Sequence, residues 1–169
     1  MNRQPHIKIL ILNWNGEKII NKCIDSINNL SYSNYSIGII DNGSTDNSLN
    51  IISTNFPDIK IYKINKNLGY AKGYNYAFDI LKEQSFDYYL LLNNDAYVNK
   101  ALLKDLNNNL IKYGENNIYS PKIKFYKKNR LWFAGGLYNK VLGHTAKLIN
   151  VNHDNVTNFK KSLHLSTKN

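Results

Sequence analysis

The sequence predicts an α/β protein with a Rossmann-like, doubly wound, mostly parallel sheet that carries helices on both faces. Segments with a strand pattern alternate with segments of helical periodicity from residue 7 to residue 125. The strand segments are nearly continuous apolar runs, which is typical of parallel strands buried on both faces. A β-α-β order of this kind predicts right-handed crossovers and a sheet sandwiched between helices.

Five segments have the composition of strands, rich in β-branched and aromatic residues. They are expected at 7–12, 35–40, 59–64, 86–92 and 118–125. In the last of these, Pro121 lacks a backbone N–H, so that strand is expected at an edge or as an irregular one. The fourth is the clearest, since a run of tyrosines and leucines ends abruptly in Asn93, Asn94 and Asp95.

Helices are expected between the strands, because apolar residues recur there at helical spacing. The expected ranges are 17–29, 46–55, 70–81 and 100–113. The second should start behind a capping residue, Thr45 or Asp46, and stop before Pro57. Gly114 is placed to end the fourth helix.

Composition excludes several classes of protein. The chain has 169 residues, 43% hydrophobic and 20% charged, which suits a globular domain. Its single cysteine, Cys23, rules out a disulfide framework or a cysteine-based zinc site within the chain. The first residues lack the apolar core of a signal peptide, and no apolar run reaches the roughly 18 residues of a membrane span. The default expectation is a cytoplasmic protein.

Positive charge is concentrated in the last quarter of the chain. Residues 1–121 carry 12 basic and 11 acidic side chains, whereas residues 122–169 carry 10 basic side chains and one acid, Asp154. Such a segment suits anionic lipid, a lipid-linked phosphate or nucleic acid. Lysine enrichment through AT-rich codons requires no binding partner and is the favoured interpretation. We expect residues 1–145 to form one domain, followed by a polar basic tail at 146–169 that is poorly ordered or truncated.

Each of the first four expected strands ends in a polar cluster. The clusters are Asn13-Trp14-Asn15, Asp41-Asn42-Gly43-Ser44, Asn65-Lys66-Asn67 and Asn93-Asn94-Asp95. In a parallel sheet these ends share one edge, where open α/β sheets bind ligands. Four coincident polar ends favour a ligand crevice over four independent Asx turns.

Individual residues in these clusters suit recognition of a nucleotide. Asp41 can accept a hydrogen bond from a base N–H, and Trp14 can stack on a base or simply seal the strand-helix junction. Gly69 permits close backbone approach, and Lys72 lies at a helix N-terminus that favours phosphate, although a solvated lysine is the commoner case. No GxxxxGK[ST] loop occurs, and no GxGxxG follows the first strand, which disfavours a dinucleotide site.

These clusters, in this order, resemble family 2 glycosyltransferases, especially their rhamnosyltransferase-like branch. The matching pieces are residues 11–16, 40–46, 67–75 and 91–95, and the resemblance covers about residues 7–143. It implies a GT-A fold and inverting transfer from a nucleotide-diphosphate sugar. Mapped onto this chain, the residues implied to bind the nucleotide sugar are Leu12, Trp14, Asn15, Glu17, Asp41, Asn67, Gly69, Lys72, Asn94, Asp95, Gly135 and Gly136.

The resemblance also implies a metal site and a catalytic base. Asn94 and Asp95 stand at the DxD-like position, so Asp95 is expected to bind Mg²⁺ or Mn²⁺ bridging the diphosphate. Asn94 replaces a carboxylate that some members carry there. Inverting transfer needs a general base, and no acidic residue here matches the family's base. The chain is therefore expected to be truncated before that segment, and no catalytic residue is assigned within it.

The expected function is transfer of sugar from a UDP- or dTDP-sugar to a saccharide or lipid-linked acceptor in bacterial polysaccharide synthesis. The location would be cytoplasmic, with peripheral association at the inner membrane face through the basic tail. One alternative is a catalytically incomplete fragment that only binds the nucleotide sugar. Nucleic-acid binding is the least favoured alternative, because no DNA- or RNA-binding motif occurs.

Overall fold

The structure is a computed structural model that describes residues 4–115, 117–128, 130–134, 136–139 and 144–147. The chain forms two compact units, Met1–Lys104 and Asp105–Asn169. Each unit is described by itself. The expected domain boundary at residue 145 stays a prediction, because the tail at 148–169 lies outside the described residues.

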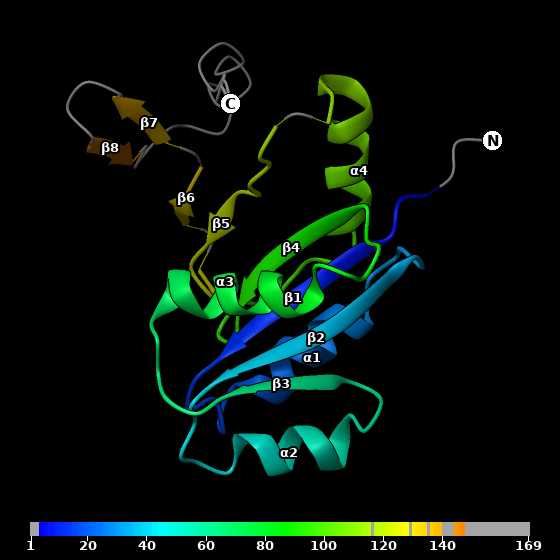
Figure 1. The fold of residues 1–169 in the computed structure, drawn as a ribbon. Coiled ribbons are helices and arrows are strands. Elements are labelled where there is room, and N and C mark those ends of the chain that lie inside the picture. Colours follow the sequence, from blue (N-terminus) through cyan, green and yellow to red (C-terminus); the bar gives the residue numbers. More distant parts are fainter. Residues whose placement is uncertain (1–3, 116, 129, 135, 140–143, 148–169) are drawn as a thin grey trace. The chain divides into compact units, whose positions relative to one another are not determined.

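A four-stranded parallel sheet forms the centre of the first unit (Figure 1). Its strand order is β3-β2-β1-β4. The bounds are β1 Ile7–Asn13, β2 Tyr35–Asn42, β3 Lys60–Ile64 and β4 Tyr88–Asn93. Strand β1 lies inside the sheet, with β2 and then β3 on one side of it and β4 on the other. The predicted fold class, a doubly wound parallel sheet, is confirmed.

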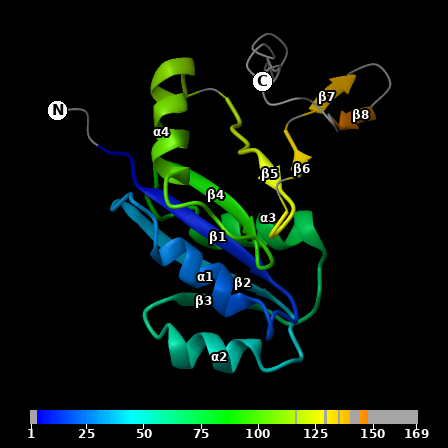
Figure 2. The same ribbon diagram turned by 180° about the vertical axis from the view of Figure 1, so that it is seen from behind.

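Helices cover both faces of this sheet. The helices are α1 Ile20–Asn28, α2 Ser48–Asn55, α3 Tyr70–Leu81 and α4 Leu102–Tyr113, the last of which crosses the boundary between the units. In Figure 1, α3 lies in front of β1 and α1 lies behind it, and the reversed view in Figure 2 exchanges them. This arrangement follows from the crossover connections between parallel strands.

Side-chain alternation along the strands builds one core on each face. Leu10 and Ile40 face α3, where they join a buried cluster with Tyr74, Ala77 and Leu81. The strand residues on either side of Leu10 and Ile40 point to the opposite face of the sheet, because successive side chains of a strand alternate. That second core contains buried side chains of β1, β2 and α1: Ile9, Ile11, Ile39, Ile20, Cys23, Ile24 and Ile27.

Helix α1 shows why the helical ranges differ slightly from expectation. The pattern predicted a start at Glu17, whereas the helix begins at Ile20. The carbonyl of Gly16 accepts hydrogen bonds from the N–H groups of both Ile19 and Ile20, at 2.9 Å each. A tight turn therefore precedes the first regular helical turn. From Ile20 onward, buried residues recur at spacings of three and four.

The second unit contains two short antiparallel pairs. Strand β5 Ile123–Lys124 pairs with β6 Leu131–Phe133, and β7 Gly136–Asn139 pairs with β8 His144–Lys147. The expected strand at 118–125 was therefore too long, since only Ile123 and Lys124 of its eight residues form a strand. Pro121 cannot donate to a ladder, which limits pairing before Ile123. Within the described residues, no helix is both long enough and apolar enough to pass through a bilayer.

Candidate functional site at the carboxyl edge of the sheet

The polar ends of the strands meet at one edge, as the sequence predicts. In the register, Asn13 lies opposite Asp41 and Leu12 lies opposite Asn93. Side-chain bonds then connect three strand ends directly. Asn13 donates to Asp41, and Asn94 donates to Asn13. The carboxyl ends of β1, β2 and β4 therefore form one hydrogen-bonded assembly.

Asn13 is the hub of this assembly and is completely buried. Its Nδ2 lies 3.2 Å from Asp41 Oδ1, 3.2 Å from Ser44 Oγ and 3.0 Å from Ser48 Oγ. Its Oδ1 accepts a bond of 2.9 Å from Asn94 Nδ2. A buried amide costs stability unless it is bonded. The arrangement of its neighbours meets that requirement on both sides of the side chain.

Asp41 is also buried, with 3% of its surface exposed. One carboxylate oxygen accepts from Asn13, and the other accepts the backbone N–H of Ser44 at 3.2 Å. Each oxygen has a second lone pair, so the carboxylate retains acceptor capacity. Asp41 thus holds the strand-end turn in shape, and its expected contact with a nucleobase stays a prediction.

The loops that follow β1 and β2 are held together by two pairs of hydrogen bonds. Asn15 N–H donates to Ser44 Oγ at 3.0 Å, and Thr45 N–H donates to Asn15 Oδ1 at 2.8 Å. Asn15 has a left-handed φ of 49°, which asparagine tolerates better than most residues. Next to it, Trp14 is 53% exposed, so its ring is available for stacking.

The second pair of bonds involves Glu17 and Asp46. Glu17 N–H donates to Asp46 Oδ2 at 2.8 Å, and the Glu17 carboxylate accepts a longer bond of 3.4 Å from Asn47 N–H. Asp46 also accepts from the Ser48 N–H and hydroxyl at the start of α2. Burial alone would raise the pKa of Asp46, but these hydrogen bonds outweigh it and hold the pKa below its ordinary value. The nucleoside side of the predicted site is therefore already ordered.

A second buried amide, Asn42, shapes the loop between β3 and α3. Its Oδ1 accepts Leu68 N–H at 2.9 Å, and its Nδ2 donates to Asn67 Oδ1 at 2.9 Å and to the Gly69 carbonyl at 3.3 Å. Gly69 has a φ of 78°, and a β-carbon there would meet nothing within 4 Å. Its backbone is accordingly open to an incoming group, and its φ favours glycine.

Helix α3 begins directly after Gly69 and carries Lys72, which is exposed, in its first turn. The free N–H groups and positive end of the helix favour an anion there. One turn further on, the buried Tyr74 hydroxyl donates to Leu92 O of β4 at 2.9 Å. Burial raises the pKa of Tyr74 far above its ordinary value. The phenol thus remains a donor and fixes α3 to the strand that ends at Asn94.

Asp95 is exposed at the end of β4 and makes no hydrogen bond in the part of the chain that the structure describes. Its charge acts on Cys23, whose pKa is raised to about 12, first by burial and then by this carboxylate. Among the described residues, no three His, Cys, Asp or Glu side chains form a metal-binding group. Mg²⁺ commonly uses one or two carboxylates together with substrate phosphates. Asp95 fits that mode rather than a dedicated metal centre.

Two predicted residues are not placed relative to this edge. Gly135 lies outside the described residues, and Gly136 is the first residue of β7 in the second unit. Asp154, the remaining acid of the basic tail, also lies outside them. The expected roles of Gly135 and Gly136 in binding the nucleotide sugar stay predictions.

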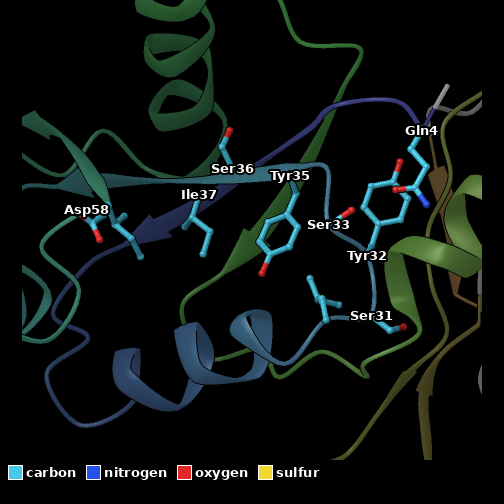
Figure 3. A pocket seen from close by; sticks show the side chains of 10 residues that line it. Gln4, Ser31, Tyr32, Ser33, Tyr35, Ser36, Ile37 and Asp58 are labelled. Atoms are coloured by element: carbon cyan, nitrogen blue, oxygen red, sulfur yellow. The ribbon is translucent and has the colours of Figure 1, made fainter.

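A hollow of about 700 Å³ lies elsewhere, where β2 begins (Figure 3). It is a wide depression lined by Tyr32, Tyr35 and Asp58, together with serines of the loop before β2. In the described structure the tyrosine hydroxyls already donate to backbone carbonyls, those of Pro5 and Ile27. The amino end of a parallel strand lies opposite the edge where such sheets bind ligands. We therefore place the candidate site at the carboxyl edge.

Sequence reasoning put Asn13 and Asn42 in the polar clusters but gave neither a role. The sequence did contain a signal for such a role, because each of these two amides ends a mostly apolar strand. Ser44 and Ser48 were missed as partners, since a serine near a helix start is ordinarily a cap.

Comparison with known proteins agrees with this geometry. The family model described as Glycosyl transferase family 2 matches residues 8–163. A Methanococcus voltae protein is 32% identical over 143 residues, which cover 80% of this chain and 40% of the relative. Its name is dolichyl N-acetyl-alpha-D-glucosaminyl phosphate 3-beta-D-2,3-diacetamido-2,3-dideoxy-beta-D-glucuronosyltransferase. An uncharacterized glycosyltransferase of Haemophilus influenzae is 35% identical over 108 residues, 61% of this chain and 42% of the relative.

Solved structures share the fold. Staphylococcus aureus TarS 1-349, determined in complex with UDP-GlcNAc, is 23% identical with a TM-score of 0.56, covering 72% of this chain and 38% of that one. The Pyrobaculum calidifontis mannosyltransferase PcManGT, in complex with GDP-Man and Mn²⁺, is 17% identical with a TM-score of 0.52, covering 63% and 32%. The chain spans about two fifths of the length of its curated relatives. With a GT-A sheet and a family model that matches most of its sequence, the chain belongs to glycosyl transferase family 2.

Proposed function

We propose that this chain is the donor-binding part of an inverting glycosyltransferase that uses a UDP- or dTDP-sugar. The observation that carries the proposal is the hydrogen-bonded edge on which Asn13 joins Asp41 of β2 to Asn94 after β4. Family 2 membership makes that edge the expected place for a nucleotide sugar. A buried, prearranged polar edge lowers the ordering cost of binding.

The nucleoside would lie over the loops after β1 and β2. The exposed ring of Trp14 offers a stacking surface for the base. Asp41 offers its remaining lone pairs to a base N–H, and the Leu12 backbone and Glu17 line the same side. Asn15 keeps the two loops together through Thr45 N–H. Binding here would require little rearrangement, because the loops are already bonded to each other.

The diphosphate would lie toward α3 and the end of β4. Gly69 exposes its backbone, and Asn67 supports it by accepting the Gly69 N–H at 2.8 Å. Lys72 contributes a positive charge at the helix N-terminus. Asp95, with Asn94 beside it, would hold Mg²⁺ or Mn²⁺ together with the diphosphate oxygens. When bound, this ion would neutralise charge that develops on the departing nucleotide.

The acceptor is proposed to be a saccharide or a lipid-linked sugar. The Methanococcus voltae relative carries a dolichyl-linked phosphate acceptor in its name, which supports the lipid-linked option. Residues 122–169 carry 10 basic side chains against one acidic one, a balance that suits an anionic membrane surface. The biological setting would be synthesis of a bacterial surface polysaccharide at the inner face of the membrane.

Thermal unfolding tests the donor site. A nucleotide sugar at about 100 times its Kd, with Mn²⁺, should stabilise the protein by about 2.7 kcal/mol, a Tm rise of roughly 5–10 °C. Asp95→Ala should remove the part of the shift that depends on Mn²⁺. Asp58→Ala is the matched control, because Asp58 is an exposed carboxylate beside the hollow near the start of β2.

Failure of UDP-, dTDP- and GDP-sugars to raise the Tm would overturn the donor-binding proposal. Transfer is tested separately by incubating the chain with donor and acceptor and measuring released nucleoside diphosphate. Binding without any release would restrict the function of these residues to donor binding.

A further inference from the structure

We propose that Asn13 is a positioning residue that couples the two ends of the site through one buried amide. Its Nδ2 holds Asp41 at the nucleoside end, and its Oδ1 holds Asn94 at the phosphate end. The assignment of these two ends rests on the proposed function. The coupling itself is a property of the folded chain and exists without ligand.

Two neighbours fix the orientation of the Asn13 amide. A carboxylate oxygen can only accept, so the group that faces Asp41 must be the amide nitrogen. The Ser48 hydroxyl donates its proton to Asp46 Oδ1 at 2.5 Å, so it too acts as an acceptor toward Asn13. Both observations direct Nδ2 toward Asp41 of β2 and Ser48 of α2. Asn13 Oδ1 is thereby directed toward Asn94.

The orientation of Asn94 follows from that of Asn13. Only the nitrogen of Asn94 can donate to Asn13 Oδ1, and the two atoms are 2.9 Å apart. The amide oxygen of Asn94 is then left as an acceptor, one residue before the exposed Asp95. Exchange of the Asn94 oxygen and nitrogen would place two acceptors against each other. The acceptors Asp41 and Ser48, acting through Asn13, therefore determine which face Asn94 presents at the phosphate end.

Energetic coupling is expected because the bonds form a chain. Donation to a carboxylate polarises an amide and makes its carbonyl a stronger acceptor, and low local dielectric enhances the effect. Asn13 has no exposed surface, so water cannot replace either bond. Changes at Asp41 should consequently be felt at Asn94, and Asn13 should be required for the transmission.

A double-mutant cycle on folding tests this without ligand. Urea unfolding of the wild type, Asp41→Asn, Asn94→Ala and the double variant is measured, then repeated in an Asn13→Ala background. With Asn13 present, the combined change in the unfolding constant should differ from the product of the single changes by about threefold or more. Without Asn13 the changes should multiply. Equal coupling in both backgrounds, or none in either, would refute the proposal.

The matched control is Asn42→Ala, which removes another buried strand-end amide. Asn42 bonds to Leu68, Asn67 and Gly69 rather than to the Asp41 chain. In an Asn42→Ala background the protein should lose stability but keep the coupling between Asp41 and Asn94. Loss of the coupling there as well would mean that general loosening, not Asn13, is responsible.

A second measurement applies if the Asn13→Ala background does not fold. Hydrogen exchange of the Asn13 side-chain amide, followed by NMR, is compared in the wild type and Asn94→Ala. Asn94→Ala leaves every acceptor of the Nδ2 protons in place, so exchange faster by tenfold or more, about the factor for one lost bond, would show coupling. Unchanged exchange would overturn it.

Binding separates this proposal from the proposed function. Asn13→Ala should weaken uridine binding without metal and should also reduce the extra affinity that UDP gains from Mn²⁺, whereas Asp95→Ala should affect only the second. If Asn13→Ala changes only the uridine affinity, or only the gain in UDP affinity from Mn²⁺, the coupling of the two ends is refuted. If the wild type binds neither uridine and UDP nor thymidine and dTDP, the proposed function fails, and the folding cycle alone decides the role of Asn13.

Discussion

Replacing Gly16 by alanine gives the sharpest test of the strand-end assembly. Gly16 does not have a left-handed φ, so alanine is compatible with its backbone. A β-carbon there would lie 2.2 Å from Asn13 Oδ1 and 2.6 Å from Asn94 Nδ2. These are the two atoms of the hydrogen bond between the Asn13 and Asn94 side chains. The Gly16 backbone cannot easily retreat, because its carbonyl bonds to Ile19 and Ile20.

The expected loss of stability follows from these contacts. Breaking a buried hydrogen bond and leaving its groups unpaired costs about 1–3 kcal/mol. Forcing neighbours aside costs a further 1–3 kcal/mol or so. Alanine returns about 0.4–1 kcal/mol by restricting the unfolded chain. The net destabilisation should be roughly 1–5 kcal/mol, a substantial share of the usual 5–15 kcal/mol of a domain.

Urea unfolding monitored by circular dichroism measures this loss. Gly69→Ala is a useful contrast, because its β-carbon would meet nothing within 4 Å and only the backbone conformation, φ 78° with ψ −179°, is unfavourable. That conformation is essentially restricted to glycine, so the substitution should cost about 1–3 kcal/mol through the backbone alone. In an Asn94→Ala background, Gly16→Ala should cost at least about 1 kcal/mol less, because Asn13 can move into the vacated space. A Gly16→Ala protein within 0.5 kcal/mol of the wild type, about the scatter of surface substitutions, would refute the reasoning.

Three further outcomes are expected. In a Trp132→Phe background, UDP or dTDP should quench the fluorescence of Trp14 by stacking, and a nucleotide that binds without quenching would exclude Trp14 from the base site. Cys23, with its pKa near 12, should not react with a thiol reagent at pH 8 until the protein unfolds. At that pH only about one part in ten thousand of the thiol is thiolate. Rapid labelling of the folded protein would contradict this expectation. Because the pKa of Asp46 is lowered on folding, its stabilising contribution is complete above the ordinary pKa and disappears as pH falls through the lower folded value. Asp46→Asn should therefore be less stable than the wild type at pH 7 and should lose less stability on acidification. The Tm of both proteins, measured against pH, tests this, and parallel Tm curves would contradict it.

The sequence predicted the four parallel strands and their helices to within a few residues. This was possible because hydrophobic spacing and the residues that start or end an element are local properties. It failed at residues 118–125, where an apolar pattern suggested a long strand and only Ile123–Lys124 is paired. Pairing depends on a partner strand, and here the partner is the short segment at 131–133. The helix start at Ile20 was also missed, because it depends on bonds to the Gly16 carbonyl rather than on apolar spacing.

By itself, the sequence determined that polar residues close successive buried strands, and parallel pairing then requires those ends to share an edge. Only the tertiary structure decided what each amide does there. Asp41 and Asn42 are consecutive in β2 and therefore point to opposite faces of the sheet. Asp41 meets Asn13 on one face, and Asn42 shapes the loop before α3 on the other. Register and alternation, which depend on distant parts of the chain, assign these partners, so no local pattern could have named Asn13 as the link.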